Sequence, residues 1–324
     1  MWEVSTALYF LISPFQPLPS SRKSMERIQT CEPDFHFNLW ILLPAATFPT
    51  YFVWKSEGEM RGITLLLSVL AILVLWVAFS WRDTFDPESL SDARVLVTGA
   101  SDGIGEQMAY HYARFGAQIV LTARREAVLQ KVMMKCLELG AKKVFYFPAD
   151  MASPTEPENL VRFALQHLGG LDYVVNFFSY VSIASAALPA LMETKGSLVV
   201  VSSLAGRISN PFISAYAATK FALEGFFGSL RHELIMQKKD VSITLCFLGF
   251  IDTESAMKIT GGKVTNTPAP ASEAALAIVK GGATRATEVV YPWTIQLLFL
   301  IRDWFPEQRD KIIRGNFIYD PPLD

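Results

Sequence analysis

The sequence has few cysteines and no basic tract, and both absences exclude classes of protein. Its three cysteines, Cys31, Cys136 and Cys246, are too few and too scattered for a disulfide framework or a zinc site. Cys136 and Cys246 lie in apolar helix and strand patterns, so we expect them to be buried free thiols. The net charge of −2 and the absence of a basic tract argue against a nucleic-acid partner.

Charged residues are also scarce. They make up 19% of the chain against 51% hydrophobic residues, a balance typical of a globular protein with membrane contact. The run Gly62–Trp81 contains no charged residue, and as a helix it would rise about 30 Å, the thickness of a bilayer's hydrocarbon core. Residues 60–82 are therefore predicted to be a retained transmembrane signal anchor. The alternative is a buried core helix in a soluble reductase.

The flanks of this run predict a single-pass topology. Lys55 and Arg61 precede it and Arg82 follows it, which favours a cytosolic amino terminus and a main domain in the endoplasmic-reticulum lumen. A second apolar stretch, Phe37–Trp54, contains two prolines. It either forms the first leg of a hairpin, which would reverse the topology, or lies on the membrane surface. Residues 1–59 are otherwise a leader to which we assign no role.

Beyond residue 90, apolar runs alternate with helical patterns. Six runs are predicted to be buried parallel strands, at residues 94–98, 117–122, 143–147, 171–175, 197–202 and 241–247. Helical patterns lie between them, at residues 104–115, 125–139, 155–168, 177–192 and 214–236. Residues 90–290 are therefore predicted to be a Rossmann-like α/β domain. This fold is a doubly wound parallel sheet whose ligand lies at the carboxyl ends of the strands.

The first predicted strand leads into a glycine-rich turn, Thr98–Gly105, and then into a helix. Phosphates bind backbone N–H groups at a helix start, and glycines let that backbone approach them closely. Because the turn stands between a strand and a helix, dinucleotide binding is favoured over a tight packing turn.

The end of the second predicted strand bears on the choice of cofactor. Arg124 and Arg125 stand where NAD-binding proteins usually carry a carboxylate, and a guanidinium suits a 2′-phosphate. NADP(H) is therefore predicted and NAD(H) is less favoured, although Asp102 nearby would repel the phosphate. Two exposed arginines at a helix start are the alternative. Asp150 follows the third strand, where it either contacts adenine or caps a helix.

Tyr216 and Lys220 lie four residues apart at the start of the longest helical pattern, so they share one helical face. We expect the ammonium to lower the pKa of the Tyr216 phenol and make it a general acid/base. Ser203 ends the fifth predicted strand and is expected to hold the substrate oxygen. A solvated surface pair is the alternative, but the glycine turn upstream favours catalysis.

Four segments resemble the short-chain dehydrogenase/reductase family, in particular its membrane-anchored 11-beta-hydroxysteroid dehydrogenases: TGASDGIGEQMAYHYARFGA, VVVSSLAG, AYAATKFALEGFFGSLRHEL and SITLCFLGFIDTESAM. The resemblance covers residues 60–315 and implies NADP(H), hydride transfer on a steroid or similar lipophilic substrate, a lumenal domain and a homodimer. It implies that Ser203, Tyr216 and Lys220 are catalytic, with Lys220 also on the nicotinamide ribose. It further implies that the cofactor is contacted by Gly99, Ser101, Gly103, Ile104, Arg124, Asp150, Tyr216, Lys220, Ile251 and Thr253. Gly105 belongs to the same glycine turn and is counted with these contacts.

The chain departs from this family after the fourth predicted strand. The family places an Asn-Asn-Ala-Gly-like turn there and a catalytic asparagine on the next helix. Counted back from Ser203, Asn176 takes the place of the helical asparagine; counted forward from Asp172, it takes the place of the first turn asparagine. About two dozen family residues are therefore absent between Val175 and Asn176, including that turn and the front of the crossover helix.

This gap leaves two functions open. The leading hypothesis is an NADP-dependent oxidoreductase in which Asn176 is the catalytic asparagine. The alternative is a splice-variant-like, catalytically impaired anchored protein that binds cofactor or a homologous partner. The remaining crossover, Asn176–Lys195, exceeds the roughly dozen residues that a parallel connection needs, so the sheet can still close.

The carboxyl-terminal part carries two further predictions. Glu254–Pro270 is predicted to be a mobile substrate loop because it is rich in threonine, glycine and proline. Residues 291–324 contain the apolar run Trp293–Phe305, which is too short to span a bilayer. This segment is expected to dock on the membrane, complete a dimer or cap the substrate pocket.

Overall fold

The computed structural model describes residues 67–72, 84–176 and 179–318, and the chain divides into two units, Met1–Arg82 and Asp83–Asp324. Within the first unit, residues 67–72 are helical. The predicted leader and most of the predicted anchor lie outside the described residues. In the part of the chain that is described, no helix is both long and apolar enough to cross a membrane.

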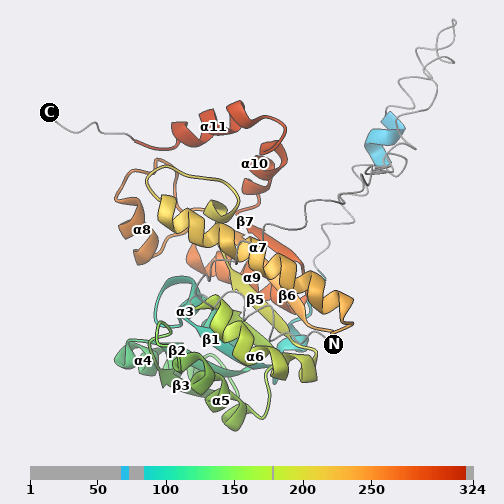
Figure 1. Ribbon diagram of the computed structural model, residues 1–324. Helices are drawn as coiled ribbons and strands as arrows, with labels where there is room; N and C mark the ends of the chain where they lie inside the picture. Colours follow the sequence, from blue (N-terminus) through green and yellow to red (C-terminus); the bar gives the residue numbers. More distant parts are fainter. Residues whose placement is uncertain (1–66, 73–83, 177–178, 319–324) are drawn as a thin grey trace, which may run out of the picture. The chain divides into compact units, whose positions relative to one another are not determined.

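The second unit is built on a seven-stranded sheet in which every pair of neighbouring strands is parallel, in the order β3-β2-β1-β4-β5-β6-β7 (Figure 1). The strands are β1 (Arg94–Thr98), β2 (Gln118–Ala123), β3 (Lys143–Pro148), β4 (Tyr173–Asn176), β5 (Ser197–Val201), β6 (Ser242–Leu248) and β7 (Glu288–Tyr291). The predicted doubly wound parallel sheet is confirmed. The seventh strand is not among the predicted strands. It has only four residues, lies at the edge of the sheet and is only partly buried, so its apolar run is too short to stand out in the sequence.

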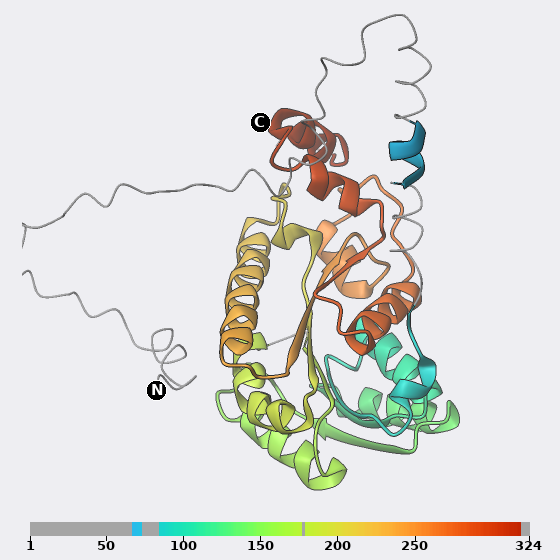
Figure 2. The ribbon, with the colours of Figure 1, turned by 90° about the vertical axis from the view of Figure 1, so that its right-hand side faces the viewer.

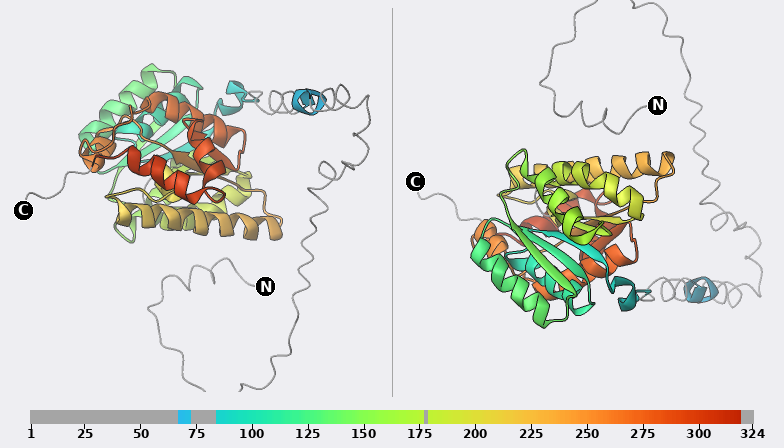
Figure 3. Two further views of the ribbon diagram at one scale, coloured as in Figure 1. Left: turned by 90° about the horizontal axis from the view of Figure 1, so that it is seen from above. Right: turned by 90° about the horizontal axis from the view of Figure 1, so that it is seen from below.

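Helices cover both faces of the sheet. Figures 2 and 3 show α3 (Gly103–Arg114), α4 (Glu126–Glu138) and α9 (Ala271–Ala283) on one face, and α5 (Glu156–Leu168), α6 (Tyr180–Thr194) and α7 (Ser214–Met236) on the other. Two short 3-10 helices, η2 (Pro87–Leu90) and η3 (Leu204–Gly206), precede β1 and follow β5. The remaining helices are α8 (Glu254–Thr260), α10 (Ile295–Ile301) and α11 (Pro306–Gly315), beyond the end of the sheet where β6 and β7 finish.

The core lies between the sheet and these helices. The central strands β1, β4 and β5 are almost entirely buried, and Met108 and Tyr112 of α3 pack with Val279 of α9 against them. Cys136 and Cys246 are buried free thiols, as predicted. Burial raises the pKa of Cys136 to about 12 and that of Cys246 further, so both thiols stay protonated and unreactive at neutral pH.

The shortened crossover after β4 still closes the sheet. β4 pairs in parallel with β1 on one side and with β5 on the other. The helix α6 that joins β4 to β5 begins after Ser179 and ends before Lys195. Both of these residues have a left-handed backbone conformation, with φ of 50° and 56°. A non-glycine residue in this conformation is strained, so the crossover reaches across the sheet with strained residues at both ends of its helix.

Candidate active site

The glycine turn lies where β1 passes into α3. Gly99 and Gly103 have φ of 64° and 56°, and a Cβ on Gly105 would stand 2.3 Å from the carbonyl oxygen of Gly99. Asp102 precedes α3, but its side chain makes no capping hydrogen bond. The first N–H groups of α3 therefore remain available to an anion, which is the arrangement that a dinucleotide pyrophosphate requires.

The arginine that reaches this turn is Arg125. Its Nη2 donates to the Ser101 carbonyl oxygen at 3.0 Å and lies 3.9 Å from the Asp102 carboxylate. Arg124, the predicted cofactor contact, is exposed and makes no hydrogen bond or ion pair with the described residues. The predicted repulsive Asp102 is thus paired with a guanidinium, which offsets its charge at the turn. The sequence pattern does not determine which of these two adjacent arginine side chains turns back towards the glycine turn.

Thr253 and Ile251 follow β6, and Thr253 lies against the same turn. A Cβ on Gly103 would stand 2.9 Å from Cγ2 of Thr253, so the Thr253 side chain packs directly against the backbone of Gly103. Thr253 also caps α8 by accepting from Ala256 N at 3.2 Å, so the predicted loop Glu254–Pro270 begins as a helix. Asp150, after β3, is exposed and accepts from Ala152 N at 3.1 Å, which is the turn-capping geometry.

Ser203, Tyr216 and Lys220 come together at the carboxyl end of β5. Ser203 precedes η3 and accepts from Ala205 N at 3.2 Å, and its hydroxyl lies near enough to Tyr216 to lower the pKa of that phenol. Lys220 Nζ lies 5.6 Å from the centre of the Tyr216 ring, one turn along α7. Because all strands are parallel, this cluster and the glycine turn lie at the same edge of the sheet.

The pKa values of this cluster differ from the expectation. Burial raises the pKa of Tyr216, and the nearby Ser203 hydroxyl offsets only part of that rise. Burial also lowers the pKa of Lys220 to about 8. The prediction that Lys220 lowers the pKa of Tyr216 is therefore wrong for this structure. The physical reason is that the ammonium donates elsewhere, to the Tyr180 hydroxyl at 2.6 Å and to the Val201 carbonyl at 3.1 Å.

The structure decides between the two positions that sequence counting allows for Asn176. Asn176 is the last residue of β4, is fully buried and pairs with Val200 of β5, so it does not stand on the crossover helix. Its Nδ2 donates to the Tyr180 carbonyl at 2.9 Å, and its Oδ1 accepts no hydrogen bond from the described residues. Asn176 therefore ends the strand, where the family has the first asparagine of its turn.

Comparison with known proteins identifies the family. A sequence model described as short chain dehydrogenase matches residues 93–176 and 173–263. The chain belongs to this short-chain dehydrogenase family. The protein named hydroxysteroid 11-beta-dehydrogenase 1-like protein of Gallus gallus is 55% identical, with 81% of this chain and 100% of the relative aligned. The protein of the same name from Danio rerio is 51% identical, over 79% of this chain and 98% of the relative. The predicted resemblance is thus confirmed.

The same comparisons locate the missing segment. The two matches to the short-chain dehydrogenase model meet within residues 173–176, at β4. The alignment with the Gallus gallus protein spans 288 residues, whereas 81% of this 324-residue chain is about 262, so about 26 positions have no counterpart here. Both observations agree with a deletion between Val175 and Asn176.

Solved structures share the fold. A short-chain dehydrogenase from Burkholderia cenocepacia in complex with NADP is 25% identical, with a TM-score of 0.54, over 62% of this chain and 97% of that one. A 7α-hydroxysteroid dehydrogenase in complex with NADH and 7-oxo glycochenodeoxycholic acid has a TM-score of 0.56 at 19% identity, over 64% and 96%. The alignments therefore run along almost the whole length of each known chain.

Proposed function

We propose that this chain is an NADP(H)-dependent oxidoreductase that interconverts a hydroxyl and a ketone on a steroid or similar lipophilic substrate. The observation that carries the proposal is that Ser203, Tyr216 and Lys220 gather at the same sheet edge as the glycine turn. The chain is also 55% identical to a protein named as hydroxysteroid dehydrogenase-like, which supports the substrate class.

The residues around the glycine turn fit a dinucleotide. The uncapped start of α3 and the close approach of Gly99 to Gly105 would cradle the pyrophosphate, and Arg125 beside Ser101 would bind the 2′-phosphate of NADP. Arg124, Asp150, Ile104, Ile251 and Thr253 remain proposed cofactor contacts. A nicotinamide bound there supplies or accepts the hydride.

The chain's own part in the reaction is proton transfer. Ser203 holds the substrate oxygen, and Tyr216 gives that oxygen a proton in reduction or takes one in oxidation. At neutral pH the Tyr216 phenol is protonated, so it has a proton to give to a ketone oxygen. Lys220 is the proposed partner of the nicotinamide ribose and of the phenolate.

The direct test is NADPH binding together with turnover of an 11-keto steroid by the purified full chain. We expect NADPH to bind with a lower Kd than NADH, and Tyr216→Phe to abolish turnover while leaving NADPH binding intact. Binding of neither nucleotide would overturn the proposal. So would turnover that Tyr216→Phe leaves unchanged.

A second candidate rests on the gap after β4. Asn176 ends a strand instead of standing on the helix, and Lys220 donates to Tyr180. These observations favour an impaired protein that binds cofactor or pairs with a homologous chain. NADPH binding without turnover would support this candidate. Restoring the missing residues from the Gallus gallus relative would then restore turnover.

We further propose that residues 60–82 anchor the chain in the endoplasmic-reticulum membrane as a single pass. Residues 90–290 would form the lumenal catalytic domain, and residues 291–324 would dock on the membrane or in a homodimer. Trp293, Trp304 and Phe305 at the proposed docking segment are 61%, 82% and 54% exposed, which supports an apolar partner. Release of the chain from membranes by alkaline carbonate would refute the anchor. Protease digestion of intact microsomes tests whether the catalytic domain lies on the lumenal side, where it should be protected.

A further inference from the structure

Lys220 is held by residues outside the predicted catalytic set. Its Nζ donates to the hydroxyl of Tyr180 at 2.6 Å and to the carbonyl oxygen of Val201 at 3.1 Å. The ammonium lies 4.8 Å from the centre of the Tyr180 ring and 5.6 Å from that of Tyr216. Tyr180 therefore takes the short polar contact of the lysine, although Tyr216 stands on the same helix as Lys220.

The hydroxyl of Tyr180 acts towards Lys220 only as a hydrogen-bond acceptor. It donates to the Val201 carbonyl at 2.6 Å while it accepts from Lys220. A phenol has one O–H donor, and burial raises the pKa of Tyr180 well above its ordinary value. The three groups form a closed triangle in which two neutral oxygens accept from the ammonium, and no carboxylate of the described residues pairs with it.

The start of α6 places Tyr180 in this position. Asn176 Nδ2 donates to the Tyr180 carbonyl at 2.9 Å, and the Ser179 hydroxyl donates to the carbonyl of Met151. Asn176 is paired with Val200, the neighbour of Val201, so the first turn of α6 is tied to β5 beside the lysine. The direct passage from β4 into α6 thus brings the tyrosine to Lys220.

Neutral oxygens do not compensate a partly buried charge as an anion does. This agrees with the lowered pKa of Lys220, about 8, and with the raised pKa of Tyr216. A charged ammonium close to Tyr216 would have the opposite effect on the phenol. The contact with Tyr180 therefore opposes the chemistry that the Tyr216–Lys220 spacing predicts.

We propose that Tyr180 is a positioning residue that holds Lys220 away from Tyr216 and so keeps the proposed hydride-transfer centre in a latent state. This Tyr180 latch, formed by Tyr180, Lys220 and the Val201 carbonyl, rests on the function proposed above. Removing the Tyr180 hydroxyl leaves the lysine one fewer acceptor and frees it to approach Tyr216. A tyrosine that instead relayed protons to Lys220 would make its removal harmful.

The test is the titration of Tyr216 in the full chain without cofactor. The phenolate absorbance of each protein is compared with that of the same protein carrying Tyr216→Phe, so the difference reports Tyr216 alone. We expect Tyr180→Phe to lower the pKa of Tyr216 by about one unit, equivalent to a tenfold gain in phenolate. Tyr180→Leu gives the same readout if the phenylalanine variant folds poorly.

Two controls show that the lysine carries the effect. Tyr173→Phe removes another partly buried phenol hydroxyl, at the start of β4, and should leave the Tyr216 titration unchanged. In a Lys220→Met background, Tyr180→Phe should have no effect. An unchanged or raised Tyr216 pKa in Tyr180→Phe, or the same shift without Lys220, overturns the latch.

NADPH binding, measured separately, keeps the two proposals distinguishable. A Tyr216 shift without NADPH binding supports the latch and overturns the proposed function. NADPH binding without the shift supports the proposed cofactor site and overturns the latch. Where both hold, Tyr180→Phe should increase turnover of an 11-keto steroid, and a loss of turnover would identify Tyr180 as a relay.

Discussion

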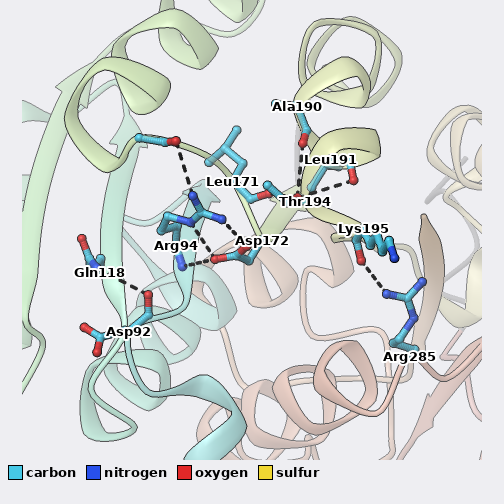
Figure 4. A network of polar contacts seen from close by, with 11 residues as sticks. Asp92, Arg94, Gln118, Leu171, Asp172, Ala190, Leu191, Thr194, Lys195 and Arg285 are labelled. Atoms are coloured by element: carbon cyan, nitrogen blue, oxygen red, sulfur yellow. Dashed lines mark hydrogen bonds and ion pairs between the residues drawn. The ribbon is translucent and has the colours of Figure 1, made fainter. Parts of the chain in front are cut away.

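Arg94 and Asp172 join β1 to the start of β4 at the edge of the sheet opposite the proposed site (Figure 4). The guanidinium donates to both carboxylate oxygens, from Nη2 at 2.7 Å and from Nε at 2.9 Å, and the Arg94 backbone N–H donates to Asp172 at 2.9 Å. β1 and β4 are neighbours where the strand order of the sheet reverses, which is where doubly wound folds bind their ligands, so this pair fixes the spacing of the two strands that flank the proposed cofactor crevice. A cavity of about 320 Å³ lies beside the Arg94–Asp172 pair and is lined in part by Asp172, Lys195 and Arg285.

Asp172→Asn should destabilise the fold by about 1–3 kcal/mol at pH 7, because it leaves a partly buried guanidinium without its anion. Partial burial alone would raise the pKa of Asp172, but the bonds from Arg94 hold it below its ordinary value. The stabilisation is therefore present above the unfolded pKa of about 4 and is lost as the pH falls through the lower folded value. Urea denaturation at pH 7 and pH 3 measures this: the gap between wild type and Asp172→Asn should shrink at pH 3, and a constant gap would contradict the pairing.

Gly105→Ala should unfold the glycine turn or destabilise the domain by about 1–3 kcal/mol, because its new Cβ would meet the Gly99 carbonyl oxygen at 2.3 Å. Thermal melting and NADPH binding report the two consequences. The matched control is Gly225→Ala on α7, where nothing lies within 4 Å of the new Cβ and about 0.5–1 kcal/mol of stabilisation is expected. Equal stability changes in the two variants would show that the turn tolerates a side chain.

Arg125→Ala should raise the Kd for NADPH about tenfold and change that for NADH much less, because one charge-assisted contact to the 2′-phosphate is lost. Nucleotide fluorescence titration measures both constants. Lys131→Ala removes an equal charge from an exposed position on α4 and serves as the control for long-range electrostatics. A larger effect from Arg124→Ala than from Arg125→Ala would show that the arginine chosen from the sequence binds the phosphate.

Lys220→Met should stabilise the fold at neutral pH by at most about 3 kcal/mol, because burial lowers the pKa of this lysine to about 8. The folded chain then binds fewer protons than the unfolded chain between pH 8 and the ordinary lysine pKa near 10.5. Over that range the Lys220 contribution to the free energy of unfolding rises with pH. The stability advantage of Lys220→Met should accordingly be largest at pH 7 and smaller at pH 10, and an advantage that grows with pH would refute the lowered pKa.

Local pattern accounts for the elements that were predicted well. The apolar run 94–98 and the helical pattern 214–236 coincide with β1 and α7, because each carries its own signal over its full length. The edge strand β7 and the helix α8 carry weaker signals, since they are short and only partly buried. Their formation depends on neighbours: β7 pairs with β6, and α8 is capped by Thr253.

The sequence by itself determined the strand, glycine turn and helix that open the domain, and the placing of Tyr216 and Lys220 on one helical face. Both follow from interactions within a few residues, so no knowledge of the rest of the chain is needed. Only the tertiary structure decided that Asn176 ends a strand and that the Lys220 ammonium meets Tyr180, 40 residues away along the chain. The reason is that strand pairing and the direction of a buried charge depend on which segments the fold brings together.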